Sequence, residues 1–297
     1  MANSIALAQK YLPLIDEVYK AESKTSILDT GSERLDFINA NTVKIYQIAT
    51  SGLGNYNRST GFPTGDVTGT WETFTLTQDR GREFNIDAMD EDETLDLTVG
   101  ATMSTFMRVS VVPEVDQYRF AKYAAAAKLS ATGTITPGTT NVADLIAVAQ
   151  QEMGNAEVPV EGRILFVSEL AYRALKGNIA RYLANENGVN KNIEMFDDMR
   201  VIRVPSGRFN TAVTIGDNGF TQGGTAINFM IIHPSAVAQV VKHEVPRMFA
   251  PAVNQSADAW KLQYRLYHDA FTVEHGTVQA SNTTGQTNGI YLHKVGA

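Results

Sequence analysis

The chain contains no cysteine among its 297 residues. It can therefore form no disulfide, bind no metal through thiolates and use no thiolate nucleophile. Its hydrophobic content of 43% is ordinary for a globular protein and argues against wholesale disorder. These features predict a folded protein made in a reducing cytosol.

Long apolar runs are also missing. No stretch reaches the roughly 18–20 residues that a membrane-spanning helix needs. Residues 1–10 lack the basic leader and apolar run of a secretory signal. We expect neither membrane insertion nor secretion.

The charge balance lacks a basic excess. Lys and Arg number 25 against 32 Asp and Glu, a net charge of −7. Nucleic-acid-binding modules are usually basic, so the chain is not predicted to be one. A small basic surface facing DNA remains compatible with this balance.

Catalytic signatures are absent as well. There is no G-x-S-x-G, no P-loop and no H-E-x-x-H. The glycines at Gly52 and Gly54 fail the dinucleotide pattern, because its last position is Asn57. We predict a non-enzyme without a cofactor. The alternative is an α/β enzyme with an inserted ribbon, which a metal-dependent activity would support.

One group of candidate metal ligands pairs His268 and Asp269 with Glu274 and His275. Imidazole and carboxylate ligands often occur together in metal sites. On a single strand, each histidine would share a face with one carboxylate, but at a distance. Ordinary strand polarity, or a contact between subunits, explains these residues better than a metal site does.

A second candidate group is acidic. Asp90, Asp92 and Asp96 could bind calcium or magnesium, but they lack the glycine turn of an EF-hand. Acidic residues in a first helical turn already offset the positive end of the helix dipole. We therefore predict no metal site.

The most informative segment present runs from Thr42 to Asp87. Residues 43–48 and 71–78 alternate in polarity like strands, and the second strand resumes at 83–86. The tip between them is rich in glycine and poor in large apolar residues. Because a lone two-stranded ribbon is marginal in water and has unpaired edges, this one is predicted to lie on a neighbouring chain.

A long helix is predicted after the ribbon. Apolar residues at spacings of three and four run through residues 95–106, and the helix resumes at 114–128 after a kink at Pro113. At about 1.5 Å per residue it would exceed about 50 Å, which suits an elongated molecule. Residues 4–22 form another amphipathic helix, packed either on its own domain or on a neighbour.

The rest of the chain predicts a small α/β domain and returning strands. Its expected parts are a linker at 130–140, a helix capped by Asn141, a strand at 163–167 with a helix at 169–176 capped by Ser168, loops at 178–225, a strand at 228–232 with a helix at 235–242, and strands at 260–273 and 290–293. The chain is thus predicted to be α+β.

Arg80 and Arg82 flank Gly81, with an acid outside each of them. They either lie in a solvated bend of the second strand or make bidentate pairs with carboxylates of another subunit. The residues leave both possibilities open.

The order of these parts resembles the major capsid proteins of tailed bacteriophages, which have the Hong Kong ninety-seven fold. The residues that carry the resemblance are Gly61-Phe62, Asp66-Val67-Thr68 and Trp71-Glu72 in the ribbon, residues 78–84 after it, and Val111–Asp116 with Tyr118-Arg119-Phe120 in the long helix. It covers nearly the whole chain, most strongly residues 1–125.

The resemblance implies a division into five parts. These are an N-terminal arm at 1–41, an extension loop at 42–87, a spine helix and peripheral domain at 88–129, an axial domain at 130–250, and returning strands shared by both domains at 251–297. The extension loop would lie over an adjacent subunit.

Two departures from the family bear on assembly. Some members cross-link through a loop lysine, but no lysine lies between Lys44 and Lys122, so no cross-link is expected. Some carry a long N-terminal scaffolding region, whereas this sequence begins at the arm. A separate scaffolding protein is therefore expected.

The implied function is a self-assembling icosahedral shell around double-stranded DNA, built from hexamers and pentamers in the bacterial cytoplasm. Expected partners are a scaffolding protein, a portal, a cement protein and weakly bound DNA. The alternative is an encapsulin-like nanocompartment shell. Candidates for contact between subunits are Tyr56, Arg58, Phe62, Trp71, Arg80, Arg82 and Glu83.

Overall fold

The computed structural model describes residues 23–29, 36–37, 42–89, 97–182, 192–254, 256–273 and 289–296. Its longer helices are α3 (Leu97–Phe106), the π-helical turn η2 (Met107–Val111), α4 (Val112–Ala126), α5 (Val142–Asn155) and α6 (Glu169–Tyr182). Its strands are β1 (Asp36–Phe37), β2 (Thr42–Thr50), β3 (Val67–Thr75), β4 (Gln78–Asp87), β5 (Leu129–Thr132), β6 (Ile164–Ser168), β7 (Met195–Phe196), β8 (Met199–Val204), β9 (Asn210–Gly216), β10 (Gly219–Ile232), β11 (Val237–Phe249), β12 (Ala259–Thr272) and β13 (Ile290–Lys294). Short 3-10 turns cover Ser206–Arg208 and Pro234–Ala236. The fold is mixed α+β, as predicted.

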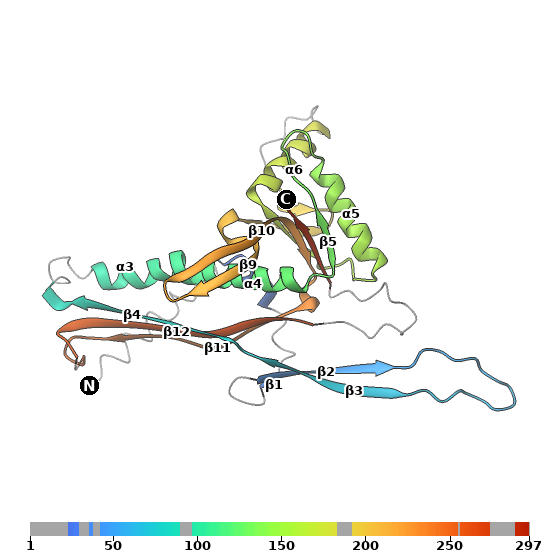
Figure 1. Cartoon of the computed structure of the whole chain (residues 1–297), viewed down its shortest axis with the longest axis horizontal. Coiled ribbons are helices and arrows are strands. Elements are labelled where there is room, and N and C mark those ends of the chain that lie inside the picture. The colour runs from blue at the N-terminus through green and yellow to red at the C-terminus, as the bar shows by residue number, and fades with distance from the viewer. Residues whose placement is uncertain are drawn as a thin grey trace.

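The strands form three sheets (Figure 1). The central sheet has the order β5-β13-β10-β6-β8-β7, and β9 pairs with the outer half of β10. A long sheet of order β11-β12-β4 lies below it, and β1, β2 and β3 form the third sheet. No helix among the described residues is long and apolar enough to cross a membrane.

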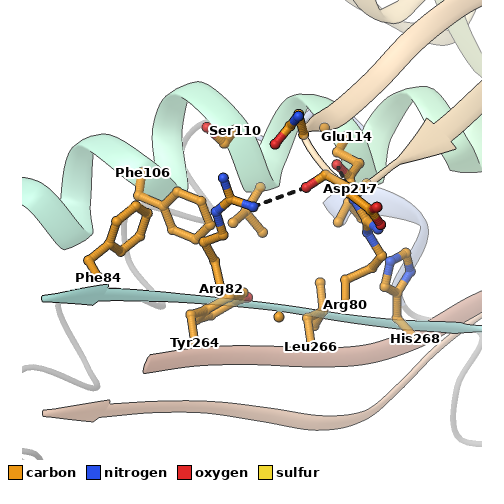
Figure 2. A pocket seen from close by; sticks show the side chains of 15 residues that line it. Arg80, Arg82, Phe84, Phe106, Ser110, Glu114, Asp217, Tyr264, Leu266 and His268 are labelled. Carbon is orange, nitrogen blue, oxygen red and sulfur yellow. Dashed lines mark hydrogen bonds and ion pairs between the residues drawn. The ribbon is translucent and has the colours of Figure 1, made fainter. Parts of the chain in front are cut away.

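The spine formed by α3, η2 and α4 connects the two large sheets. Its first half packs on the long sheet, where Met107, Val112 and Val115 meet Leu262 and Tyr264. Figure 2 shows Phe106 of the spine beside Phe84 of this sheet. Its second half packs under the central sheet. The spine therefore belongs to both cores and fixes how the two sheets are joined.

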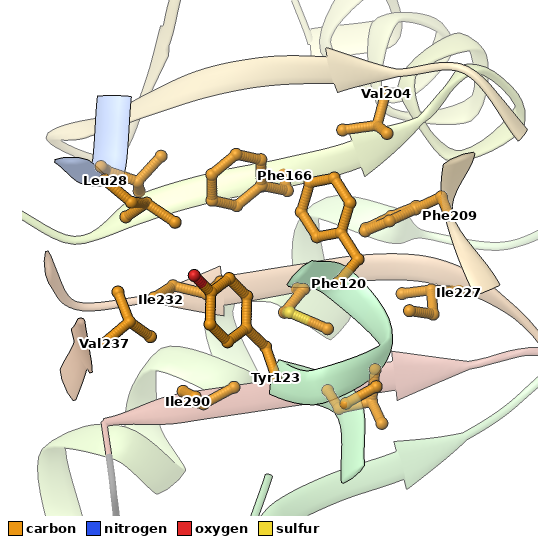
Figure 3. Packing of buried hydrophobic residues seen from close by; sticks show 14 of the residues in the cluster. Leu28, Phe120, Tyr123, Phe166, Val204, Phe209, Ile227, Ile232, Val237 and Ile290 are labelled. Carbon is orange, nitrogen blue, oxygen red and sulfur yellow. The ribbon is translucent and has the colours of Figure 1, made fainter. Parts of the chain in front are cut away.

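The central sheet is covered on both faces. On one face, Phe120 and Tyr123 of α4 pack against Phe166 and Phe209 (Figure 3). On the other face, α5 and α6 bury a second cluster that includes Tyr172 and residues of β6. Helices on both faces explain why all five residues of β6 are buried.

The predicted break at Pro113 takes the form of a π-helical turn just before it. The N–H of Val112 reaches back to the carbonyl of Met107, one residue further than in an α-helix. Proline supplies no N–H of its own, and a local π turn is a common way to accommodate such a defect. The helical run continues from Leu97 to Ala126.

The ribbon is shorter than predicted. β2 and β3 pair along their whole length, from Thr42 opposite Thr75 to Thr50 opposite Val67. β4, however, leaves the ribbon and pairs with β12. Residues 42–87 are therefore not one ribbon: the paired ribbon covers 42–75, and residues 78–87 belong to the long sheet.

Two further predictions in the α/β region are wrong, and a third is confirmed only in part. The expected linker at 130–140 is irregular from residue 133 onward, but its first residues belong to β5, which pairs with β13. The expected loops at 178–225 contain β7, β8 and β9. The expected helix at 235–242 is instead the start of β11, where β-branched Val237, Val240 and Val241 favour a strand and pair with β12.

The two predicted helix caps have different outcomes. The Ser168 cap is confirmed, because its Oγ accepts the N–H of Ala171 at 3.2 Å. The Asn141 cap is wrong: its side chain makes no cap bond and instead accepts a hydrogen bond from Asn178. The arm helix at 4–22 lies outside the described residues.

Candidate functional site

The ribbon projects away from the rest of the molecule (Figure 1). Beyond the last paired residues of β2 and β3, Ser51 links the two sides of the ribbon. Its N–H and its Oγ both donate to the carbonyl of Asp66 at 2.9 Å. Further out, Asn57 and Gly61 form an isolated bridge, and Gly61 has a φ of 83°. That backbone conformation favours glycine. The tip, residues 51–66, is thus an ordered loop with its own hydrogen bonds.

Large apolar side chains are exposed on this tip. Leu53 is fully exposed, Phe62 is 89% exposed, and Tyr56 meets Phe62 edge-on at 5.0 Å. Within the described chain, no hydrogen bond, ion pair or ring contact joins the tip to anything outside the ribbon. Exposed apolar groups gathered on a projecting element indicate an interaction surface.

The root of the ribbon is anchored by a small apolar cluster. Val43 of β2 and Leu76, just after β3, are buried against Val240 of β11, with Tyr267 and Phe271 packed around them. Both strands of the ribbon are therefore packed against the long sheet at the base of the ribbon.

A buried carboxylate lies beside this cluster. Asp269 of β12 has no exposed surface. Its Oδ2 accepts the N–H and the hydroxyl of Thr77, each at 2.8 Å, and its Oδ1 accepts the hydroxyl of Tyr118 at 2.8 Å. Its Oδ1 also accepts the N–H of Ala270. Asp269 therefore joins the ribbon root, the spine and the long sheet.

Arg80 and Arg82 hold the turn between β9 and β10 over the spine (Figure 2). Arg80 makes a bidentate pair with Glu114, at 2.7 and 3.3 Å, and donates to the carbonyl of Gly216 at 2.8 Å. Arg82 donates to the carbonyl of Asp217 at 3.0 Å. These groups border a cavity of about 260 Å³ between the spine and the long sheet.

Glu83 is also engaged within the chain. Its carboxylate accepts hydrogen bonds from Gln263 at 2.6 Å and lies 3.1 Å from the amine of Lys261. The hydrogen bond from Gln263, followed by that from Lys261, lowers the pKa of Glu83.

The residues that the sequence suggested for contact between subunits divide into two groups. Those on the ribbon, including Tyr56, Arg58 and Phe62, project outward, while those on β4 make contacts within the chain. Contact of either group with another subunit stays a prediction.

Solved structures share this arrangement. A chain of the bacteriophage PhiM1 mature capsid has a TM-score of 0.63 at 12% identity, over 86% of this chain and 82% of that one. A chain of the capsid of Cyanophage P-SCSP1u has a TM-score of 0.57 at 11% identity, over 88% and 85%. A chain from Gordonia phage Cozz has a TM-score of 0.60 at 13% identity, over 92% and 87%.

The chain has a phage capsid fold. At these identities the likeness concerns the fold. No family profile matches the sequence, and no curated protein resembles it.

Within this phage capsid fold, His268 is buried. It is 2% exposed, and its Nδ1 has no hydrogen-bond partner among the described residues. Burial lowers the pKa of His268 to about 3, reinforced by the charge of Arg119 and opposed by that of Asp269. Glu274, His275 and the acidic group Asp90, Asp92 and Asp96 lie outside the described residues, and the described residues contain no cluster of three metal ligands.

His268 predicts a loss of stability in mild acid. The unfolded chain protonates this histidine near pH 6.5, while the folded chain keeps it neutral until about pH 3. The stability that depends on a neutral His268 is therefore fully present above pH 6.5. Between pH 6.5 and about pH 3, the free energy of unfolding falls by about 1.4 kcal/mol for each pH unit that the pH drops. Urea unfolding at pH 7 and pH 5 should show a smaller pH dependence in H268Q than in the parent chain. An equal dependence in both would contradict this assignment.

Sequence reasoning missed the buried polar residues. Asp269 was weighed as a metal ligand against ordinary strand polarity or a contact between subunits, and Tyr118 entered only as part of a family resemblance. The alternation of the strand predicts the wrong environment for Asp269, because it places this residue on the polar face with Lys261 and Arg265. Nothing local identifies Thr77 and Tyr118 as its partners either, because they are 192 and 151 residues away.

Proposed function

We propose that this chain is the major capsid protein of a tailed phage, and that it self-assembles into an icosahedral shell enclosing double-stranded DNA. The observation that carries the proposal is a phage capsid fold extending over most of the chain, combined with a ribbon tip whose apolar side chains are exposed among the residues that the structure describes. The ribbon, residues 42–75, would lie on an adjacent copy.

The parts of the subunit would then have separate tasks. Residues 1–41 would form the arm, and the spine with the long sheet would form the peripheral domain. The central sheet with α5 and α6 would form the axial domain, in the range 130–250, and β12 and β13 would be the returning strands. Repeating the same contacts between copies closes rings, here hexamers and pentamers, and then a shell.

The stability of such a shell would come from many modest contacts. A standard interface buries about 1,200–2,000 Å², and linked contacts add strength without any single tight one. Because no lysine lies between Lys44 and Lys122, the ribbon would hold by packing, hydrogen bonds and charge. A separate scaffolding protein, a portal and a cement protein would complete the particle. DNA would be held by weak, sequence-independent contacts.

The second candidate is a cellular nanocompartment shell of the same fold. The similar structures described above come from phages, which favours the phage shell. Neighbouring genes would separate the two: terminase, portal and tail genes accompany a phage shell, and a single cargo enzyme accompanies a nanocompartment. Neither function is enzymatic.

Electron microscopy of the purified chain, alone and co-expressed with the adjacent candidate scaffold gene, tests the proposal. Closed particles built mainly from this chain are expected, together with fast-sedimenting material in a sucrose gradient. A protein that stays a folded monomer of about 32.4 kDa under both conditions would contradict it.

A further inference from the structure

We infer that Asp269 sets the direction in which the ribbon leaves the body, and that it acts as a positioning residue for the overlap between copies. The consequence for assembly rests on the proposed function. The consequence for the ribbon's direction does not, because it concerns a single chain.

The geometry of the root carries this inference. Only Leu76 and Thr77 separate β3, which belongs to the ribbon, from β4, which belongs to the long sheet. Asp269 accepts hydrogen bonds from both the N–H and the hydroxyl of Thr77. It therefore fixes the backbone at this junction as well as the side chain. The carbonyl of Leu76 accepts the hydroxyl of Tyr267 at 3.1 Å. Both connecting residues are therefore tied to β12.

Tyr118 extends the same network to the spine. Its hydroxyl donates to Asp269 and lies 3.2 Å from the hydroxyl of Thr77. A change in the spine at this point would be transmitted to the ribbon root through two hydrogen bonds. Asp269 thus contacts both the spine and the junction, while forming part of the long sheet.

The ribbon acts as a lever on this junction. β2 and β3 have nine residues each, which gives about 30 Å of strand at about 3.3 Å per residue. A rotation of about 10° at the root would move the far end of the strands by about 5 Å over that length. Hydrogen bonds fail over displacements far smaller than this. A contact made by the tip therefore depends on the direction fixed at the root.

Spin-label distances in the monomer test the inference directly. Because the chain has no cysteine, N57C on the tip and A125C on the exposed face of α4 would be its only thiols. Double electron–electron resonance then measures the distance between tip and spine. We expect a single narrow distribution in the parent chain. D269N, T77V and Y118F should each at least double its width or shift its mean by about 5 Å or more, the displacement of a 10° rotation.

The matched control is T75V, which changes an exposed threonine two residues before Thr77. It should leave the distribution unchanged. If D269N fails to fold, T77V and Y118F carry the test, since each removes one hydroxyl and little volume. Unchanged distributions in folded T77V and Y118F would overturn the inference.

Assembly of the same variants is measured separately. Shell yield should fall about tenfold in Y118F, the change in an equilibrium constant that corresponds to about 1.4 kcal/mol. If the parent chain forms no shells but the distance distributions still change, the proposed function fails and the role of Asp269 in ribbon direction stands. Normal shells from variants with an altered ribbon direction would overturn the link to assembly.

Discussion

Replacing Asp116 with alanine should lower the free energy of unfolding by about 3–5 kcal/mol, the usual cost of breaking a buried charged network. Asp116 lies on α4 and is completely buried. Its Oδ1 accepts the hydroxyls of Ser23 and Thr25 at 2.8 and 2.7 Å, and its Oδ2 accepts the N–H of Lys24 at 2.9 Å. Arg208 lies 3.4 Å from Oδ2.

The loss is large because several groups depend on one carboxylate. In D116A the N–H groups of Lys24 and Thr25 would lose their acceptor in a buried site, and Arg208 would lose a counter-charge. Each buried donor left unsatisfied costs about 1–3 kcal/mol. The segment at residues 23–29 would then detach from the spine, along with Leu28 in the central core.

Urea unfolding followed by circular dichroism measures this effect. D144A is the matched control, because Asp144 is exposed in the first turn of α5 and its loss should cost about 0.3–1 kcal/mol. D116N should fall between D116A and the parent chain, since the amide keeps one acceptor oxygen. A D116A chain as stable as D144A would show that the network contributes little.

The parts of the fold that sequence reasoning predicted correctly are those with a strong local pattern. The alternation around Trp260, Leu262 and Tyr264 predicted β12, and the apolar run at 163–167 predicted β6. The helical spacing before and after Pro113 predicted the spine. β12 has one face in the core, so the period of its apolar residues reports the structure directly, whereas the unbroken apolar run of β6 reflects burial on both faces.

The errors occurred where tertiary pairing decides the outcome. Residues 235–242 follow Pro234, which suits a helix start, but Val237 to Val241 pair with β12 and lie at the edge of the long sheet. β4 continues β3 with a gap of two residues, so no local pattern shows that it changes sheets. Its partner is β12, about 180 residues further along the chain.

The candidate site was predictable in part for the same reason. An exposed glycine-rich tip with isolated aromatic residues is visible in the sequence, and the structure places Tyr56 and Phe62 together on it. The roles of Arg80 and Arg82 were not predictable, because their partners Glu114 and Asp217 come from the spine and from a distant turn. Two alternatives were left open for these arginines, and the structure adds contacts within the chain that neither of them described.

Removing the ribbon tip should abolish shells while leaving the chain folded. The sharpest variant replaces residues 51–66 with Asn-Gly, because Thr50 pairs with Val67 and this dipeptide closes such a pair in a two-residue turn. The replacement removes the exposed Leu53, Tyr56 and Phe62. It leaves the apolar cluster at the ribbon root untouched, so the free energy of unfolding should change by less than about 1 kcal/mol.

Assembly should be lost because the replacement removes the exposed apolar side chains of the tip. These side chains are exposed within the described part of the chain, and under the proposed function an adjacent copy buries them. Burial of one large apolar side chain contributes about 1.5–3 kcal/mol. Removing three such side chains from every contact would therefore remove most of the binding free energy of a modest interface. Electron microscopy and sucrose-gradient sedimentation should therefore show no closed particles, and circular dichroism should show a native spectrum.

The matched control is T64S, which alters the same exposed loop without removing an apolar group. It should assemble as the parent chain does. A third variant, with Leu53, Tyr56 and Phe62 all changed to serine, separates the side chains from the length of the loop. If the triple variant assembles normally while the Asn-Gly variant does not, the backbone of the tip makes the contact. Normal shells from the Asn-Gly variant would mean that the ribbon tip has no part in assembly.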